Sequence, residues 1–417
     1  MREGQVSGGV CFLCCVCVFL LHFHVPTLYA QTAGEELRSV LLAQGNAEYE
    51  GNEITLLPSA REKFDDMFRT IREAQHFVHL EYFIFRNDSV GTALIRLLHE
   101  KAREGVEVRL LIDAYGNYKA PHPMKRAQLD SIRSLGISVS LFDPIRFPYI
   151  RNLLHRDHRK IVVVDGRVAY TGGMNVADYY LHGTKRTGEW RDMQVRLEGP
   201  VVDEFERIFA CIWGRVTGEA LDSLRYHAPL QTEGHERMIV VNREPGRLSR
   251  QMRRAFVASL DAARERVCIV NPYPTGTRSV RRAMRRALKR GVRMEIMVSA
   301  NVDNRLVPEV LGIQMKKLMK RGAEVYYYEG GFHHSKVMTV DGEFCTVGTT
   351  NIDGRSLRYD YEVNVFVFSP ETTAKFDSIF RRDVSRSELL TPETFRRRFP
   401  LRRRIVGRIF QPLKGLL

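Results

Sequence analysis

The chain repeats itself, and this internal repeat constrains the fold more than any other feature of its 417 residues. An apolar segment, an amphipathic segment closed by glycine and a second apolar segment occur at 76–114 and again at 266–300. The first copy reads HFVHLEYFIF and then GTALIRLLHEKAREGVEVRLLIDA, and the second reads RVCIVNPYP and then RSVRRAMRRALKRGVRMEIMVSA. Apolar runs that alternate with helical periodicity predict strands alternating with helices, so each copy is expected to be an α/β unit.

The duplication predicts two mostly parallel sheets flanked by helices and related by a pseudo-twofold axis, although one large continuous sheet also fits the pattern. We expect a first half at 31–225 and a second half at 248–394. The segment between them, 226–247, is more polar and carries Pro229 and Gly234, which predicts a linker.

The two ends of the chain differ in composition from the rest. Residues 1–30 contain an apolar run from Val10 to Leu21, which predicts a secretory signal peptide or a short membrane anchor. Residues 395–417 hold seven arginines, one lysine and no acidic residue, interleaved with large apolar side chains. This composition favours a tail lying on an anionic lipid surface over a solvated basic tail.

The net charge of +15 predicts an acidic partner, which is nucleic acid, an anionic membrane or a phosphate-bearing substrate. The apolar and basic tail favours lipid. The sequence lacks a basic strand surface interleaved with aromatic residues on which bases would stack, so no nucleic-acid partner is expected.

Two short stretches at matching places in the repeat carry the most reactive side chains. They are HRDHRKIVVVDG at 155–166 and HHSKVMTVDG at 333–342, and both contain His-x-Lys with an Asp five residues later. Residues two apart on a strand point to the same face, so each copy presents an imidazole beside an ammonium group. One such pair occurs by chance at a solvated strand end, but the full pattern occurs twice. The candidate catalytic residues are His158, Lys160, Asp165, His334, Lys336 and Asp341.

Two histidines and two lysines that converge between the halves suit a phosphodiester. The lysines, together with Asn175 and Asn351 of the matching segments that follow, are placed to neutralise and hydrogen-bond the non-bridging oxygens. One histidine would attack phosphorus while the other protonates the leaving oxygen, which requires opposite protonation states. This chemistry needs no metal, no cluster of metal ligands accompanies the motifs, and no cofactor is expected.

A nucleophilic histidine needs an acceptor on its other ring nitrogen to fix the tautomer. Asp192 follows His158 by 34 residues, and Glu362 follows His334 by 28. Each acid begins the last strand of its own half, so each is expected to orient the histidine of that half. An acid at a strand start is as often a surface charge, and the spacing alone leaves both readings open.

These motifs resemble the phospholipase D superfamily, which is defined by two such motifs in a duplicated α/β fold, and most closely its bacterial cardiolipin synthases. The resemblance covers about 77–382. It rests on EYFIF, GVEVRLLIDAYGN, HRDHRKIVVVDG, GGMNVADYY, EWRDMQVRLEGP, NPY, FHHSKVMTVDG and VGTTNIDGRSLRYDYEVNV. It implies transfer of a phosphatidyl group between two phosphatidylglycerol molecules through a phosphohistidine, giving cardiolipin and glycerol. The alternatives are a hydrolytic phospholipase D, in which water resolves the phosphohistidine, and less favoured, a phosphodiesterase or nuclease of the same superfamily.

The resemblance also implies a role for each candidate residue. His158 matches the position that forms the phosphohistidine, and His334 matches the acid that releases glycerol and then activates the acceptor, although symmetric halves allow the reverse. The implied roles of the others are phosphate binding by Lys160, Lys336, Asn175 and Asn351, maintenance of the site's geometry by Asp165 and Asp341, and orientation of the histidines by Asp192 and Glu362.

The implied partners are phosphatidylglycerol and anionic membrane lipid. The implied location is the bacterial cell membrane, with the protein exported or facing the periplasm if residues 1–30 act as a signal.

Overall fold

The computed structural model describes residues 31–118, 122–144, 151–222, 233–246, 248–303 and 306–412. The predicted signal or anchor at 1–30 and the last five residues of the tail lie outside the described residues. All described helices and strands belong to one unit, Ala33–Leu417. None of the helices in this described part is both long enough and apolar enough to span a membrane.

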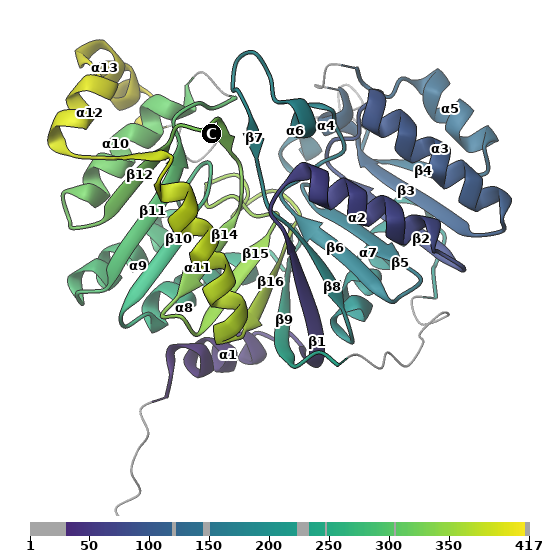
Figure 1. The fold of residues 1–417 in the computed structure, drawn as a ribbon, viewed down its shortest axis with the longest axis horizontal. Helices are drawn as coiled ribbons and strands as arrows, with labels where there is room; N and C mark the ends of the chain where they lie inside the picture. The colour runs from purple at the N-terminus through teal and green to yellow at the C-terminus, as the bar shows by residue number, and fades with distance from the viewer. Residues whose placement is uncertain are drawn as a thin grey trace, which may run out of the picture. The chain divides into compact units, whose positions relative to one another are not determined.

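The strands form two half-sheets with the same order of matching elements (Figure 1). The first half-sheet runs β1 (Glu48–Leu57), β8 (Gln194–Glu198), β6 (Val168–Gly172), β5 (Lys160–Val164), β2 (Phe77–Tyr82), β3 (Glu107–Asp113) and β4 (Ser138–Phe142). The second runs β9 (Glu236–Arg243), β16 (Glu362–Phe368), β15 (Phe344–Gly348), β14 (Val337–Val340), β10 (Arg266–Val270), β11 (Arg293–Ser299), β12 (Glu324–Tyr328) and β17 (Ser387–Leu389). The duplicated α/β fold predicted from the repeat is confirmed.

The half-sheets differ from the expectation in two details. Antiparallel pairing of β1 with β9 joins them into one hydrogen-bonded sheet of 15 strands. Within this 15-stranded sheet, parallel pairing is confined to β2–β3–β4 and β10–β11–β12, and the inner strands of each half are antiparallel. The physical reason is the length of the connections, because strands joined by a tight Asp-Gly turn form a hairpin, and only a helical crossover returns the chain parallel.

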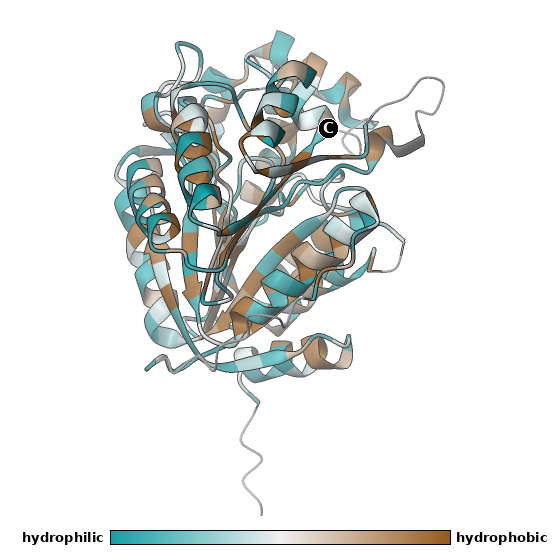
Figure 2. Ribbon diagram, turned by 90° about the vertical axis from the view of Figure 1, so that its right-hand side faces the viewer, coloured by the Kyte–Doolittle hydropathy of each residue, from teal (hydrophilic) through white to brown (hydrophobic). Residues whose placement is uncertain are grey.

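Helices cover the outer faces of both half-sheets. In the first half these are α2 (Ala60–Arg72), α3 (Ser89–Arg103) and α5 (Arg126–Ser134), and in the second α8 (Gln251–Ala262), α9 (Arg278–Lys289) and α10 (Val307–Met319). Hydrophilic and hydrophobic residues alternate along such helices (Figure 2), which is typical of helices with one face on a sheet. The shorter elements are α1 (Ala33–Ala43), α4 (Ala114–Tyr118), η1 (Arg151–Leu154), α6 (Tyr179–His182), β7 (Trp190–Arg191) and β13 (Phe332–His333).

The two halves share an apolar core. It contains side chains from both half-sheets together with α7 (Val201–Thr217) and α11 (Pro370–Val384), and β15 of the second half contacts β6 and β8 of the first. Ile161 and Val163 of β5 and Val337 of β14 all contribute to this shared core. β5 and β14, the strands within the two motifs, are therefore held in one packed core, which fixes the positions of the side chains at their ends.

The predicted linker at 226–247 is wrong in its second part. Residues 236–243 form β9, a central strand that pairs with β1 on one side and with β16 on the other. Met238, Ile239, Val240 and Val241 are all buried there. This apolar run is only four residues long and is flanked by charged residues. The polar average composition of 226–247 therefore did not indicate a strand.

The C-terminal tail is folded in its described part. It forms α12 (Pro392–Arg398) and α13 (Leu401–Ile409), which packs against α10. Phe395 and Phe399 are buried in the core of the second half, so the expectation that they face lipid is wrong. Their spacing of four residues places them on one helical face, and that face meets the protein.

Candidate active site

In both motifs, the aspartate that ends the shared spacing lies in the turn of a hairpin. β5 and β6 are joined through Asp165 and Gly166, and β14 and β15 are joined through Asp341 and Gly342. Both aspartates adopt φ of 53°, a left-handed conformation that Asp tolerates better than most residues.

The two motif aspartates stabilise this turn region and do not reach the histidines. The Asp165 carboxylate accepts hydrogen bonds from the backbone N–H groups of Gln75, His76 and Phe77 at 2.8 Å each. Asp341 does the same for the residues that begin β10, with distances of 2.7–2.9 Å. At about 3.3 Å per residue, the strand separates each aspartate from its histidine by roughly 20 Å. The structure therefore places both aspartates outside the group that can touch a substrate.

Replacing Asp165 by alanine is expected to destabilise the fold by about 2–4 kcal/mol, because three backbone N–H groups lose their acceptor and one of them is buried. Asp341→Ala should cost less, since two of its three hydrogen bonds are exposed. Asp165→Asn keeps one acceptor oxygen and tolerates the same φ, so it serves as the matched control. Urea unfolding followed by circular dichroism measures the loss. Equal stability of Asp165→Ala and wild type would refute this structural role.

The two His-Lys pairs meet across the boundary between the halves. The N–H of His158 donates to the carbonyl oxygen of Tyr361 at 3.0 Å, and the N–H of His334 donates to that of Arg191 at 2.6 Å. β7 also pairs in parallel with β13, which places Trp190 opposite Phe332. Each histidine is thus attached by its backbone to the segment that starts the last strand of the other half.

This backbone pairing determines which acid meets which histidine. Nδ1 of His158 lies 3.0 Å from Oε1 of Glu362, and Nδ1 of His334 lies 2.7 Å from Oδ2 of Asp192. The pairing is crossed, so the expectation that each acid orients the histidine of its own half is wrong. Both acids are fully buried, so the alternative of a surface charge is also wrong. In each pair Nε2 is the ring nitrogen left to meet a substrate.

Burial and nearby cations both act to lower the pKa values of the two histidines. Burial lowers the pKa of His158 well below its usual value, and Lys160, Lys336 and His334 lower it further. Burial and then Lys336 lower the pKa of His334, while its ion pair with Asp192 acts in the opposite direction. The influence of Lys336 and His334 on His158 shows that the side chains of the two halves act on one another.

The pKa values of the two acids are shifted in opposite directions. Burial acts to raise the pKa of Asp192, but Lys336 and His334 outweigh it and hold the pKa below the usual range, so Asp192 is ionised. Burial raises the pKa of Glu362 to about 7, in spite of Lys160. The Thr349 hydroxyl donates to Oε2 of Glu362 at 2.5 Å. The two histidines are therefore oriented by acids of unequal strength.

The lysines are buried as deeply as the histidines. Lys160 donates to the carbonyl oxygen of His158 at 2.5 Å, and Lys336 donates to that of His334. Burial lowers the pKa of Lys160 to about 7 and that of Lys336 to about 8, and the acids of the site partly oppose this. A phosphate bound between the two ammonium groups would favour their charged forms and replace the lost hydration.

The two asparagines occupy matching positions with different partners. Oδ1 of Asn175 accepts from the N–H of Ile84 at 3.0 Å, and its Nδ2 donates to the Tyr180 hydroxyl at 3.0 Å. Oδ1 of Asn351 is buried and has no hydrogen-bond partner among the described residues. Asn175 is thus engaged within its own half, whereas Asn351 retains an unused polar atom.

Aromatic rings and one close glycine complete the surroundings of the histidines, and sequence reasoning did not identify them. The ring of Phe83 lies 5.0 Å from that of His158, and the rings of Phe332 and Trp190 lie 5.2 and 5.6 Å from that of His334. A Cβ on Gly173 would overlap the Asp192 carboxylate, so only glycine fits there. The double glycine in TGGMN was the one signal in the sequence from which this close approach could have been predicted.

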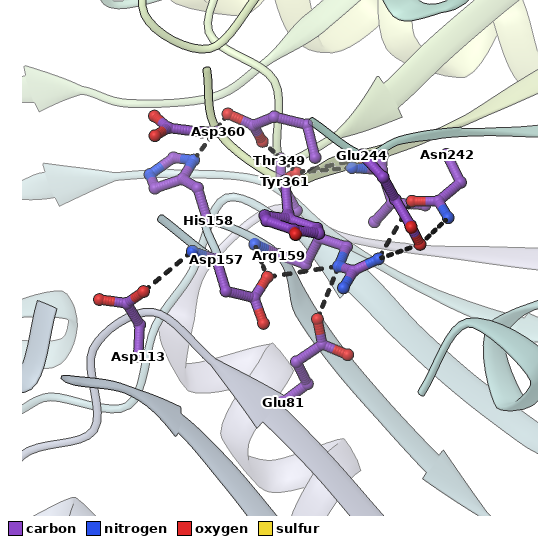
Figure 3. A network of polar contacts seen from close by, with 12 residues as sticks. Glu81, Asp113, Asp157, His158, Arg159, Asn242, Glu244, Thr349, Asp360 and Tyr361 are labelled. Carbon is purple, nitrogen blue, oxygen red and sulfur yellow. Dashed lines mark hydrogen bonds and ion pairs between the residues drawn. The ribbon is translucent and has the colours of Figure 1, made fainter. Parts of the chain in front are cut away.

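A buried network of charges surrounds Arg159 at the start of β5, between His158 and Lys160 (Figure 3). Nε of Arg159 lies 2.6 Å from Glu81 of β2 and 3.3 Å from Asp157. Its Nη1 donates to Oδ1 of Asn242 of β9 at 3.1 Å and lies 3.9 Å from Oε1 of Glu244. Arg159 is completely buried and binds elements of both halves, so it fixes this strand relative to the second half.

The arrangement combines two imidazoles, two lysines and two orienting acids, a set of groups that suits acid–base and nucleophilic catalysis at phosphorus. Within the described residues, no three His, Cys, Asp or Glu side chains are grouped as metal ligands.

Known proteins are similar to this chain in sequence and in fold. The family model described as the PLD-like domain of cardiolipin synthase matches residues 67–213 and 256–384. A probable cardiolipin synthase of Bacillus subtilis (strain 168) is 34% identical over 362 residues, which cover 86% of this chain and 71% of that protein. The cardiolipin synthase of Geobacillus kaustophilus (strain HTA426) is 33% identical over 368 residues, covering 87% and 72%. The crystal structure of phosphatidylserine synthase from Haemophilus influenzae Rd KW20 shares the fold, with a TM-score of 0.69 at 15% identity, covering 91% of this chain and 99% of that one.

The family model covers both halves and both motifs, and the relatives match over most of their own length. The chain therefore belongs to the cardiolipin synthase family of phospholipase D-like proteins.

Proposed function

We propose that this protein is a phosphatidyltransferase that converts two phosphatidylglycerol molecules into cardiolipin and glycerol. The observation that carries the proposal is the crossed pair of histidines, each oriented by a buried acid of the other half and each beside a buried lysine. This geometry suits a phosphodiester, and the family of the chain indicates which phosphodiester.

The first step is attack on phosphorus by Nε2 of His158. A P–N bond forms, the bond from phosphorus to the glycerol oxygen breaks, and His334 gives that oxygen a proton. The deeper lowering of the pKa of His158 supports this division of roles, because the nucleophile must be unprotonated. Ionised Asp192 raises the pKa of His334 relative to that of an unpaired buried imidazole, which suits the proton donor.

The second step reverses the first with a new alcohol. His334, now neutral, takes the proton from the glycerol hydroxyl of a second phosphatidylglycerol, and the oxygen attacks phosphorus. The P–N bond breaks, cardiolipin forms and His158 is restored. In both steps Lys160 and Lys336 compensate the charge on the non-bridging oxygens, and Asn351 offers a further polar contact.

Vesicles of phosphatidylglycerol are therefore expected to yield cardiolipin and free glycerol in equal amounts, without CTP. Thin-layer chromatography of the lipids and an enzymatic glycerol assay measure both products. Phosphatidic acid with glycerol and no cardiolipin would identify a hydrolytic phospholipase D instead. Cleavage of DNA with no change in lipid would refute the proposed substrate class.

The rate is expected to depend on pH with a maximum near neutrality. Glu362 must lose its proton to accept from Nδ1 of His158, so kcat/KM should rise through its pKa of about 7. The lysines must keep theirs, so kcat/KM should fall as the pH passes their pKa values of about 7 and about 8. Bound phosphate stabilises the ammonium form, so the falling limb of kcat should lie at higher pH than that of kcat/KM. A flat profile from pH 6 to pH 9 would contradict this assignment.

We also propose that the protein works at an anionic membrane surface through α13. Leu401, Ile405 and Ile409 recur every four residues on this helix, and each is between 46% and 65% exposed. Arginines flank them, and this combination is typical of helices that lie in a lipid interface.

Replacing Leu401, Ile405 and Ile409 together by glutamine is expected to weaken binding to anionic vesicles by about tenfold or more, because their apolar surface no longer enters the bilayer. Vesicle co-sedimentation measures the change. Because these side chains are exposed, the melting temperature should stay unchanged, whereas deleting the tail would remove Phe395 and Phe399 from the core. Unchanged vesicle binding would remove α13 from the membrane contact.

A further inference from the structure

The second half contains a cavity of about 460 Å³ between α9 and α10 whose lining is strongly basic. Neither histidine nor lysine of the two motifs lines it, so it is distinct from the reaction site. The lining has no acidic side chain. We call this cavity the arginine pocket. The cations that line it are Arg278, Arg281, Arg282, Arg285, Lys317 and Arg321.

None of these six cations forms an ion pair with a carboxylate of the described residues. Their neighbour Arg286 differs, because it forms an ion pair with Asp261 of α8 at 2.6 Å. Arg278 and Arg282, and Arg281 and Arg285, stand one helical turn apart, where like charges destabilise a helix. Burial lowers the pKa of Arg281, and the nearby guanidiniums lower it further. The pocket is therefore electrostatically unfavourable when empty, and a bound anion would relieve the repulsion.

Two further features of the arginine pocket suit an anion with several oxygens. Thr275 lines the pocket and is 2% exposed, and its hydroxyl has no hydrogen-bond partner among the described residues. The pocket also includes the first residue of α9, a helix of 12 residues, so the partial positive charge of the helix N-terminus lies at its edge. Phosphate is the common biological anion that offers enough acceptor oxygens for so many donors.

The neighbouring helix indicates where the phosphate comes from. Gln314 lines the arginine pocket from α10, and its side chain contacts that of Gln411, two residues after the end of α13. α13 lies next to α10 (Figure 1) and carries the exposed apolar face of Leu401, Ile405 and Ile409. A soluble phosphate compound would contact only the cations of the pocket. A lipid surface presents phosphate and hydrocarbon together, so it would contact both the pocket and the apolar face of α13.

We propose that the arginine pocket binds the phosphate group of an anionic phospholipid, as a lipid site separate from the one where phosphatidyl transfer occurs. The bound lipid would hold α9 and α10 against the membrane while α13 enters the same leaflet. The loop that lines the pocket also contacts the reaction site, because the N–H of Gly276, next to Thr275, donates to the carbonyl oxygen of Ile352, next to Asn351, at 2.7 Å. The lipid would therefore position the reaction site at the membrane surface.

The test uses the full chain and vesicles of phosphatidylcholine with or without phosphatidic acid. Phosphatidic acid has no headgroup alcohol to release, so the proposed transfer reaction does not consume it, and binding is measured apart from activity. The combined variant Arg278→Gln, Arg282→Gln and Arg285→Gln is expected to bind phosphatidic acid vesicles about 100-fold more weakly than wild type. All three side chains are exposed, and removing like charges should leave the melting temperature equal or higher.

The matched control removes three exposed arginines from α2 and α3 of the first half, in the variant Arg61→Gln, Arg96→Gln and Arg103→Gln. It has the same net charge and is expected to bind within about threefold of wild type. Equal losses in both variants would show a general effect of charge and refute the pocket. Unchanged vesicle binding by the pocket variant would also refute it. Titration calorimetry with inorganic pyrophosphate tests whether the pocket binds a soluble anion instead. If the wild type binds pyrophosphate, the pocket variant does not, and both bind vesicles equally, the ligand is a soluble anion and the lipid proposal is overturned.

Discussion

His158→Asn and His334→Asn are each expected to lower the rate of cardiolipin formation by at least about 10⁴-fold. The first variant lacks the nitrogen that attacks phosphorus. The second lacks the group that protonates the leaving glycerol and later activates the acceptor hydroxyl. Because the two histidines act in the same sequence of steps, the double variant should be little slower than either single one.

The two variants are expected to differ in the intermediate that they accumulate. With phosphatidylglycerol labelled at phosphorus, His158→Asn should never become labelled, whereas His334→Asn should form the phosphohistidine slowly and retain it. Acid-labile, base-stable label on the protein measures this. The exposed His76 provides the control, since His76→Asn should keep full activity. Label on His158→Asn but not on His334→Asn would reverse the roles of the two histidines, and near-full activity of either variant would refute the two-histidine mechanism.

Asp192→Asn is expected to lower the rate by about 10²–10⁴-fold, because an amide in place of the carboxylate no longer holds Nδ1–H of His334 in the required tautomer. The crossed geometry makes a sharper prediction about which histidine responds. Loss of the Asp192 charge should lower the pKa of His334 further, while the pKa of His158 stays the same. Glu362→Gln should instead perturb the ring of His158, which it contacts at 3.0 Å.

Titration of ¹⁵N-labelled histidines by NMR measures both responses in the same sample. The assignment comes from the single histidine variants. If each acid served the histidine of its own half, Asp192→Asn would shift His158 and leave His334 unchanged. That outcome would contradict the crossed pairing directly, whatever the effect on the rate.

The repeat predicted the parts of the site that lie within one short segment. His158 with Lys160, and His334 with Lys336, are two residues apart at or just before the start of β5 and β14, where local geometry brings each pair together. The fold class followed in the same way, from alternating strand and helix patterns. The inner strands are antiparallel because Asp165-Gly166 and Asp341-Gly342 close tight hairpins, a signal that was present in the sequence.

The crossed acids could not be predicted from spacing, because partners such as His158 and Glu362 are separated by 204 residues. Their pairing depends on β7 meeting β13 and on the backbone of His158 meeting Tyr361, which are contacts formed only when the halves pack. The same holds for Phe395 and Phe399, whose burial depends on a helix of the second half and not on their own segment. Composition predicts which side chains are apolar, but only tertiary contacts decide whether protein or lipid covers them.

The crossed pairing also bears on how such a chain could arise. If two identical copies of one half met about a twofold axis, each would lend its acid to the histidine of the other, so one codon would specify both acids. Both histidines would then share one environment, and neither could specialise. Joining the copies into one chain frees the two positions to differ, and here they hold aspartate and glutamate. Gene fusion is thus the event that would permit a division of labour between donor and attacking imidazoles, and a single-copy ancestor would have to function with its symmetry unbroken.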